Sequence, residues 1–237
     1  MSTVVVMARP PYPGVVLQSL VESTDLSEDD AVTLYEAMLG DVCEAVAASG
    51  GALLINYTPR EHLPESVPDD AEPKTAIADV VADAVPDHDA VRYEVQVGSS
   101  FDARVGNTVT HLLDREEADS VHVVEPTVPL LTRSVIDQTS MKLRSSPVVV
   151  GPASDGRIYY AGFTETIDFE GAFDAPALET LVRRAVSEGH DVDFIKQLTT
   201  VETASDLSTI TSLLLARSAT GRAVPDRTLA ALESIDP

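Results

Sequence analysis

The 237-residue chain has one cysteine, no tryptophan and only three lysines. A single cysteine, Cys43, excludes an internal disulfide framework and a cysteine-based zinc site. It follows Leu39 by four residues in a helical pattern, which favours a buried residue over a nucleophile. No run of 18 apolar residues occurs, so we expect no membrane-spanning segment. The first residues lack the basic region of a signal peptide, and we therefore expect a cytoplasmic protein.

Several common catalytic motifs are also missing. No G-x-G-x-x-G follows the first apolar run and no Walker A lysine motif occurs, which argues against a dinucleotide enzyme and a P-loop NTPase. The chain has no H-E-x-x-H helix and no G-x-S-x-G nucleophile elbow. A zinc protease and a serine hydrolase of the usual kinds are therefore not expected.

Positive charge is scarce. Asp and Glu number 39 against 16 Lys and Arg, giving a formal net charge of −23. Such a surface repels phosphate backbones and anionic lipid, so neither nucleic acid nor a membrane is an expected partner. The acids are scattered along the chain, which together with the scarcity of lysine is typical of a salt-accumulating halophile. Molar salt shortens the Debye length to about 3 Å and screens the self-repulsion of such a surface.

Short apolar runs alternate with helical patterns. Val4–Ala8, Ala52–Tyr57, Val121–Val124 and Pro147–Val150 predict buried strands. Ser27 is a good N-cap for a long helix that follows it. Alternating strands and helices predict an α/β sandwich with a mostly parallel sheet, whose ligands bind at the carboxyl ends of the strands.

The expected domain covers residues 1–217. Further helices are predicted between the strands and after them, at Thr75–Ala84, Phe101–Leu113, Thr132–Leu143, Pro176–Glu188 and Ala204–Ala216. Residues 218–237 are polar, and we expect a loosely held C-terminal tail there.

Four segments resemble the DUF2064 family, glycosyltransferase-like proteins of the nucleotide-diphospho-sugar transferase (GT-A) superfamily. The segments are Val4–Gly14, Ala31–Val46, Gly151–Gly162 and Val201–Leu207. The related phospholactate guanylyltransferases are a nearby alternative. The resemblance implies a single-domain GT-A-like three-layer sandwich, here in a divergent member of haloarchaeal type.

The resemblance also implies a site for a nucleotide or nucleotide sugar over the loop after the first strand. On this sequence the nucleotide-binding residues would be Ala8, Arg9, Pro10 and Gly14, together with Arg104. Arginine suits a phosphate, and glycine lets the backbone approach a ligand. A solvated surface arginine remains the alternative at both arginine positions.

The family further implies a divalent metal, Mg²⁺ or Mn²⁺, that bridges the phosphates. The expected aspartate after the middle strand is replaced by Thr127, which leaves Glu125 and Glu202 as the nearest carboxylates. Two displaced carboxylates would hold a metal weakly. Arg157 stands where the family has a second glycine.

Asp155 is the predicted catalytic residue, acting as a base or positioning an acceptor. A turn aspartate that caps its own backbone beside Gly156 is the structural alternative. Two functions therefore remain open. The chain is a glycosyl- or nucleotidyltransferase with an altered phosphate and metal site, or a catalytically degraded relative that binds a nucleotide, a metabolite or a protein.

Overall fold

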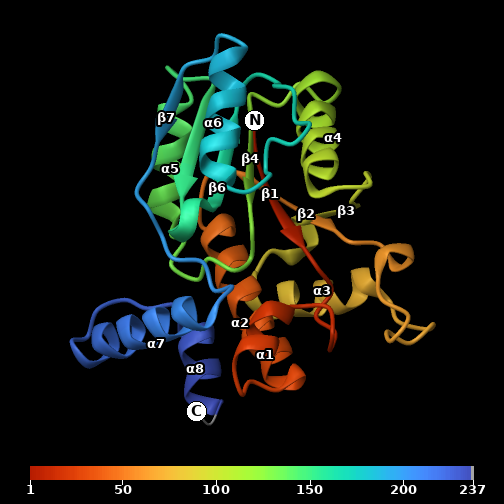
Figure 1. Cartoon of the computed structure of the whole chain (residues 1–237), viewed down its shortest axis with the longest axis vertical. Coiled ribbons are helices and arrows are strands. Elements are labelled where there is room, and N and C mark those ends of the chain that lie inside the picture. Colours follow the sequence, from red (N-terminus) through yellow and green to blue (C-terminus); the bar gives the residue numbers. More distant parts are fainter. Residues whose placement is uncertain (236–237) are drawn as a thin grey trace.

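A seven-stranded sheet lies at the centre of the computed structural model, which describes residues 1–235 (Figure 1). The strand order is β3-β2-β1-β4-β6-β5-β7. Only β6 runs antiparallel to its neighbours, and every other neighbouring pair is parallel. The strands are β1 (Ser2–Ala8), β2 (Ala52–Tyr57), β3 (Arg92–Val95), β4 (Ser120–Val124), β5 (Val148–Pro152), β6 (Ile158–Phe163) and β7 (Val192–Phe194).

The central strand β1 is apolar on both sides because both of its faces are covered. Its side chains alternate, with Val4 and Val6 in one hydrophobic cluster and Val5 and Met7 in the other. In the register, Val6 lies opposite Ile55 of β2 and Val124 of β4. A strand buried in this way has a continuous apolar sequence, which is the pattern that predicted it.

Helices cover both faces of the sheet. The first cluster joins one face to α1, α2, α3, α5, α7 and α8, and the second joins the other face to α4 and α6. The expected single-domain three-layer α/β sandwich is therefore confirmed. The helices are α1 (Gln18–Ser23), α2 (Glu28–Ala47), α3 (Pro73–Ala84), α4 (Phe101–Asp114), α5 (Arg133–Lys142), α6 (Ala177–Ser187), α7 (Ala204–Ala219) and α8 (Asp226–Ser234). Short 3-10 turns lie at Arg60–His62, His88–Ala90 and Ser154–Gly156.

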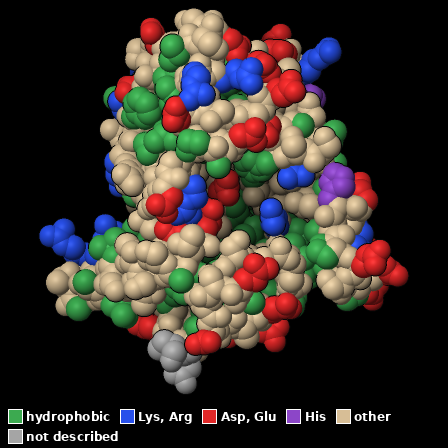
Figure 2. Space-filling view, in the orientation of Figure 1, with side chains coloured by type: hydrophobic (Ala, Val, Ile, Leu, Met, Phe, Trp, Pro, Cys, Tyr) green, Lys and Arg blue, Asp and Glu red, His purple; other side chains and the backbone are tan. Residues whose placement is uncertain are grey.

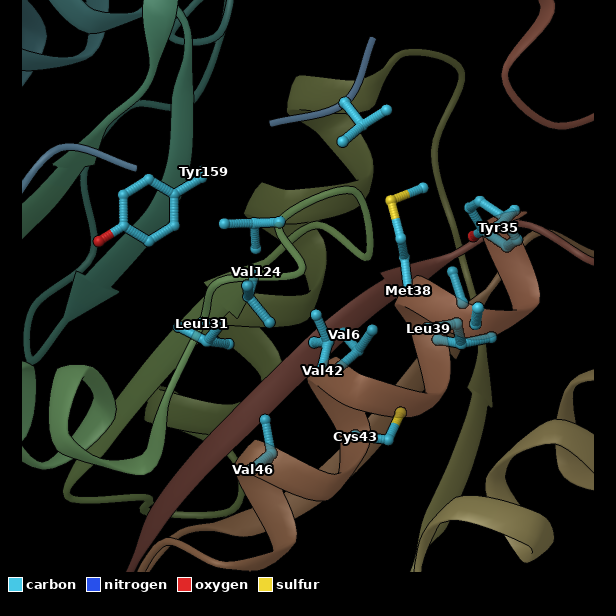
Figure 3. Packing of buried hydrophobic residues seen from close by; sticks show 14 of the residues in the cluster. Val6, Tyr35, Met38, Leu39, Val42, Cys43, Val46, Val124, Leu131 and Tyr159 are labelled. Carbon is cyan, nitrogen blue, oxygen red and sulfur yellow. The ribbon is translucent and has the colours of Figure 1, made fainter. Parts of the chain in front are cut away.

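Helix α2 begins as the sequence predicted. The Ser27 side chain accepts a hydrogen bond from the backbone of Asp30, and the Asp30 side chain accepts one from the backbone of Ser27, which completes a capping box. Figure 3 shows the buried stripe of this helix against the sheet, with Val42 beside Val6. This packing fixes the helix beside the first loop of the chain.

The prediction of a loosely held tail at 218–237 is wrong for about half of that segment. Residues 226–234 form α8, which packs on α2. The carboxylate of Asp41 on α2 accepts hydrogen bonds from the Thr228 backbone at 2.8 Å and the Thr228 hydroxyl at 2.6 Å. Little in the sequence marks this helix, because it has nine residues and buries only two of them, Thr228 and Ala231. Residues 236–237 of the predicted tail lie outside the described residues.

The loops that follow the parallel strands gather at one edge of the sheet. Six of the seven strands end there, because only β6 points the other way. In Figure 1 β1 runs down from the N-terminus toward this edge. The region after β1 contains the helix α1, which was not among the predicted helices. None of the helices in residues 1–235 is long and apolar enough to cross a membrane.

Candidate functional site

The loop after β1 is held in one shape by α2 and by its own turn. The backbone N–H of Arg9 donates to the hydroxyl of Tyr35, a buried side chain of α2, at 2.8 Å. The Val15 N–H donates to the Tyr12 carbonyl at 3.1 Å, which closes a turn. Gly14 within that turn has φ of 71°, in the region that favours glycine. The loop is therefore built before any ligand arrives.

Gln96 ties the ends of three strands together beneath this loop. Its buried amide donates to the carbonyl of Ala8 at 3.3 Å and to that of Asn56 at 2.9 Å. Its side-chain oxygen accepts from the Thr58 hydroxyl at 3.2 Å. The carboxyl ends of β1, β2 and β3 are thereby fixed relative to one another.

The first turn of α4 packs closely against the backbone at the end of β3, and this packing brings Arg104 to the same edge of the sheet. Gly98 has φ of 144°, and a Cβ placed on it would lie 2.8 Å from the Arg104 backbone nitrogen. Only glycine therefore lets the first turn of α4 sit against the end of β3. Arg104 belongs to that first turn, so its side chain reaches the loop after β1.

These elements enclose a cavity of about 180 Å³ that we call the two-arginine pocket. Its lining residues are Arg9, Gly14, Val15, Gln18, Thr58, His62, Leu63, Pro64 and Arg104. No acidic residue is among them, and within residues 1–235 neither arginine forms an ion pair. Burial and the charge of Arg9 lower the pKa of Arg104. The Nε of Arg104 is buried without a hydrogen-bond partner in the described part of the chain.

The structure thus brings together three of the predicted nucleotide-binding residues, Arg9, Gly14 and Arg104. The other two do not line the pocket. The Ala8 carbonyl accepts from Thr58 and Gln96, and the Pro10 carbonyl accepts from Tyr12. Their contribution is to the shape of the loop.

A second group of charges lies beyond β5, and we call it the Arg157 cluster: Arg157, Asp155, Thr200, Glu202 and Asp206. One nitrogen of Arg157 bonds both carboxylate oxygens of Asp206, at 3.0 and 2.9 Å. The guanidinium also lies 3.2 Å from Glu202 and 3.6 Å from Asp155, and donates to the Thr200 hydroxyl at 3.0 Å. Figure 2 shows basic side chains in the hollow across this face of the molecule, one of them set among acidic side chains.

Asp206 is also the third residue of α7 and forms the capping box of this helix with its N-cap, Thr203. Its Oδ2 accepts from the backbone N–H groups of Glu202 and Thr203 and from the Thr203 hydroxyl. In return the Asp206 N–H donates to that hydroxyl, which completes a capping box. The Arg157 cluster therefore joins the turn after β5 to the start of α7.

Glu125, directly after β4, is near enough to Arg9 and Arg157 for the charges of both groups to act on its pKa. Burial raises its pKa to about 7, and the charge of Glu202 acts in the same direction. The charges of Arg9 and Arg157 lower it, but by less. A carboxyl group that titrates near neutrality is common at functional sites.

The predicted metal ligands do not form a site that fits a divalent ion. Mg²⁺ and Mn²⁺ require several free oxygen ligands. Within residues 1–235 no three acidic, histidine or cysteine side chains are grouped so as to hold an ion. Of the two predicted ligands, Glu202 faces the guanidinium of Arg157. Thr127, at the position of the expected aspartate, has a buried hydroxyl with no partner in the described chain.

Asp155 lies in the turn between β5 and β6, in a left-handed conformation with φ of 56°. Its side chain is 81% exposed and its one ion pair in the described chain is the contact with Arg157. No contact of this residue establishes a catalytic role, which stays a prediction.

Sequence reasoning missed the groups that position the site. Tyr35 and Gln96 were not predicted as supports, and no local signal marks them because their partners are distant in sequence. A local sequence pattern does mark Asp206. Thr203 and Asp206 have the three-residue spacing of a capping box.

Comparison with known families supports the resemblance that the sequence indicated. Residues 69–175 match the family model described as "Uncharacterized protein conserved in bacteria (DUF2064)". The chain resembles DUF2064. The matched segment includes Arg104, Glu125 and Asp155, and the resemblance inferred from the sequence is confirmed over this range. No curated protein matches the chain.

Solved structures extend the likeness to nearly the whole chain. A proposed nucleotide-diphospho-sugar transferase from Desulfovibrio desulfuricans G20 is 20% identical, with a TM-score of 0.77 over 98% of this chain and 94% of its own. A cytidylyltransferase from Leptospira borgpetersenii serovar Hardjo-bovis is 11% identical, with a TM-score of 0.54 over 98% and 93%. A CMP:2-keto-3-deoxy-manno-octonic acid synthetase complexed with CTP is 11% identical, with a TM-score of 0.51 over 91% and 99%. At these identities the likeness shows the fold alone, which is the GT-A-like fold of nucleotide-dependent transferases.

Proposed function

We propose that this DUF2064-like protein binds a nucleotide or a nucleotide sugar and transfers a glycosyl or nucleotidyl group from it. The observation that carries the proposal is the two-arginine pocket, in which Arg9 and Arg104 have no acidic partner in the described chain. The pocket lies at the carboxyl ends of the parallel strands, where α/β sheets bind their ligands.

The absence of acidic partners for Arg9 and Arg104 is significant because acidic residues are abundant in this chain. The chain carries 39 acidic residues, so an arginine without a carboxylate partner is not forced by a shortage of acids. Two neighbouring guanidinium groups repel each other, and burial adds to the cost for Arg104. A phosphate relieves both effects because each arginine can donate two parallel hydrogen bonds to it.

Two carboxyl groups are suited to the chemistry that follows binding. Glu125, with a pKa of about 7, can accept a proton near neutral pH. Asp155 is exposed and lies 3.6 Å from Arg157. We assign Asp155 to the acceptor, as the sequence suggested, and Glu125 to proton transfer.

Ligand-induced stabilisation tests the binding step. The melting temperature is measured in molar KCl against a panel of nucleoside triphosphates and nucleotide sugars, for wild type and for Arg9→Gln and Arg104→Gln. A ligand at 100 times its dissociation constant stabilises the fold by about 2.7 kcal/mol. We expect one ligand to raise the melting temperature of the wild type and to lose most of this effect in both variants.

Arg144→Gln is the matched control, because Arg144 is exposed and forms no ion pair in the described chain. This variant should respond to the ligand as the wild type does. Equal responses in all four proteins would remove the two-arginine pocket as the binding site.

A second candidate function, binding without transfer, is favoured by the Arg157 cluster. The carboxylates that could assist catalysis there are already paired with a guanidinium. Product analysis by chromatography separates the two functions, using the ligand found above and a panel of acceptors. Released nucleoside diphosphate or pyrophosphate that is lost in Asp155→Asn supports the transferase. Ligand binding with no released product supports binding without transfer.

A further inference from the structure

The carboxylates of the Arg157 cluster are already neutralised by a side chain of the same protein. Arg157 is only 22% exposed, and its guanidinium contacts three carboxylates within 4 Å: Asp206, Glu202 and Asp155. Its Nε donates to the Ser154 carbonyl at 3.1 Å. Each of its three nitrogens therefore has an acceptor on the protein.

Donors of the protein fully occupy one carboxylate oxygen of Asp206, and Arg157 binds the other. Its side chain is 5% exposed. Oδ1 accepts from Arg157, and Oδ2 accepts from Arg157, from two backbone N–H groups and from the Thr203 hydroxyl. A carboxylate oxygen offers about two lone-pair directions, so these donors exhaust Oδ2.

Glu202 remains as the only acidic side chain shared by the cluster and the predicted metal pair. It is 37% exposed and its oxygen lies 3.2 Å from Arg157. A divalent ion bound to that oxygen would be a few ångströms from a guanidinium, and the two cations would repel strongly in a partly buried site.

We infer that Arg157 is the built-in cation of this site, and that the cluster holds no divalent metal ion. The positive charge that the resemblance assigns to Mg²⁺ or Mn²⁺ is supplied by a guanidinium fixed between the turn after β5 and α7. This deepens the proposed function, since phosphate binding at Arg9 and Arg104 then proceeds without added metal. Arg157 is a positioning residue in this view, because its donors are used by the protein and not by the ligand.

Metal binding by the protein alone tests the inference. Free Mn²⁺ is followed by electron paramagnetic resonance in molar KCl, with wild type, Arg157→Gln and Arg157→Lys and no nucleotide. We expect no saturable binding in wild type or Arg157→Lys, which keeps the positive charge. Arg157→Gln should gain affinity by about tenfold or more, because it frees Glu202 and Asp206.

Arg92→Gln is the matched control, because it also removes an arginine that is paired with carboxylates, but in another part of the protein. Arg92 is paired with two acids as well, Glu94 and Glu116, far from this site on β3. An Mn²⁺ affinity in Arg92→Gln equal to that of Arg157→Gln would overturn the inference, since the gain would then reflect surface charge alone.

The Mn²⁺ titration of the wild type tests the inference even if Arg157→Gln does not fold. Saturable Mn²⁺ binding by wild type that disappears in Glu202→Gln would also overturn the inference, and its absence would support it. Failure of the proposed function has a separate signature. It would appear as no nucleotide-induced melting shift with or without Mg²⁺, while the Mn²⁺ titration stays readable.

Discussion

Replacing Glu125 by glutamine isolates the energetic effect of one partly buried carboxyl group. The residue follows β4 and faces Phe101, Tyr159 and Phe173 across a small cavity of about 10 Å³. Burial raises its pKa from 4.5 to about 7, and the charge of Glu202 adds to the rise. Glutamine has nearly the same shape and resembles the protonated acid, so the substitution removes the titration and keeps the packing.

The sign of the effect follows from proton linkage. The folded protein holds this proton more tightly than the unfolded chain does. Below about pH 4.5 both states are protonated, and Glu125 then costs no stability. Between pH 4.5 and about 7 the unfolded chain ionises first and stability falls. One pKa unit corresponds to about 1.4 kcal/mol, so ionised Glu125 costs about 3 kcal/mol of unfolding free energy above pH 7.

We therefore expect Glu125→Gln to match the wild type at pH 4.5 and to exceed it by up to about 3 kcal/mol at pH 8. Denaturant unfolding in molar KCl, repeated at intervals across this pH range, measures the difference. Glu117→Gln, at an exposed position, is the control for loss of one surface charge. A Glu125→Gln difference that stays constant with pH would refute the reasoning, because only a proton taken up on folding makes it vary.

Three further predictions address the rest of the structure. Thr228→Val removes the hydroxyl that donates to buried Asp41 and should destabilise the protein by about 1–3 kcal/mol in denaturant unfolding, whereas Thr209→Val, at an exposed position of α7, should not. Burial lowers the pKa of His122 to about 4, so its imidazole should stay neutral at pH 5 in NMR titration, and the stability it supports is present above pH 6.5 and declines as pH falls toward 4. A midpoint near 6.5 would contradict this. Burial raises the pKa of Cys43 to about 12, so the thiol should resist alkylation in the native protein and react only after unfolding.

Local pattern was enough to predict most of the fold. The apolar run Val4–Ala8 predicted β1, and Ser27 predicted the start of α2. Both signals depend on neighbours within a few residues, namely side-chain periodicity and backbone capping. Helix α8 was missed because its docking depends on Asp41, nearly the whole chain away.

The candidate site divides in the same way. The resemblance named Arg9, Gly14 and Arg104 as nucleotide-binding candidates, and the sequence placed Asp155 in a turn. Only the tertiary structure put the two arginines in one pocket, through the parallel pairing of β1, β2 and β3 and the close approach at Gly98.

Two further properties of the site also depend on the tertiary structure. The pKa of Glu125 is set by burial and by charges from three other segments. The pairing of Arg157 with Asp206 joins residues 49 positions apart. Local periodicity carries no information about such pairings, because they are selected by the packing of whole elements.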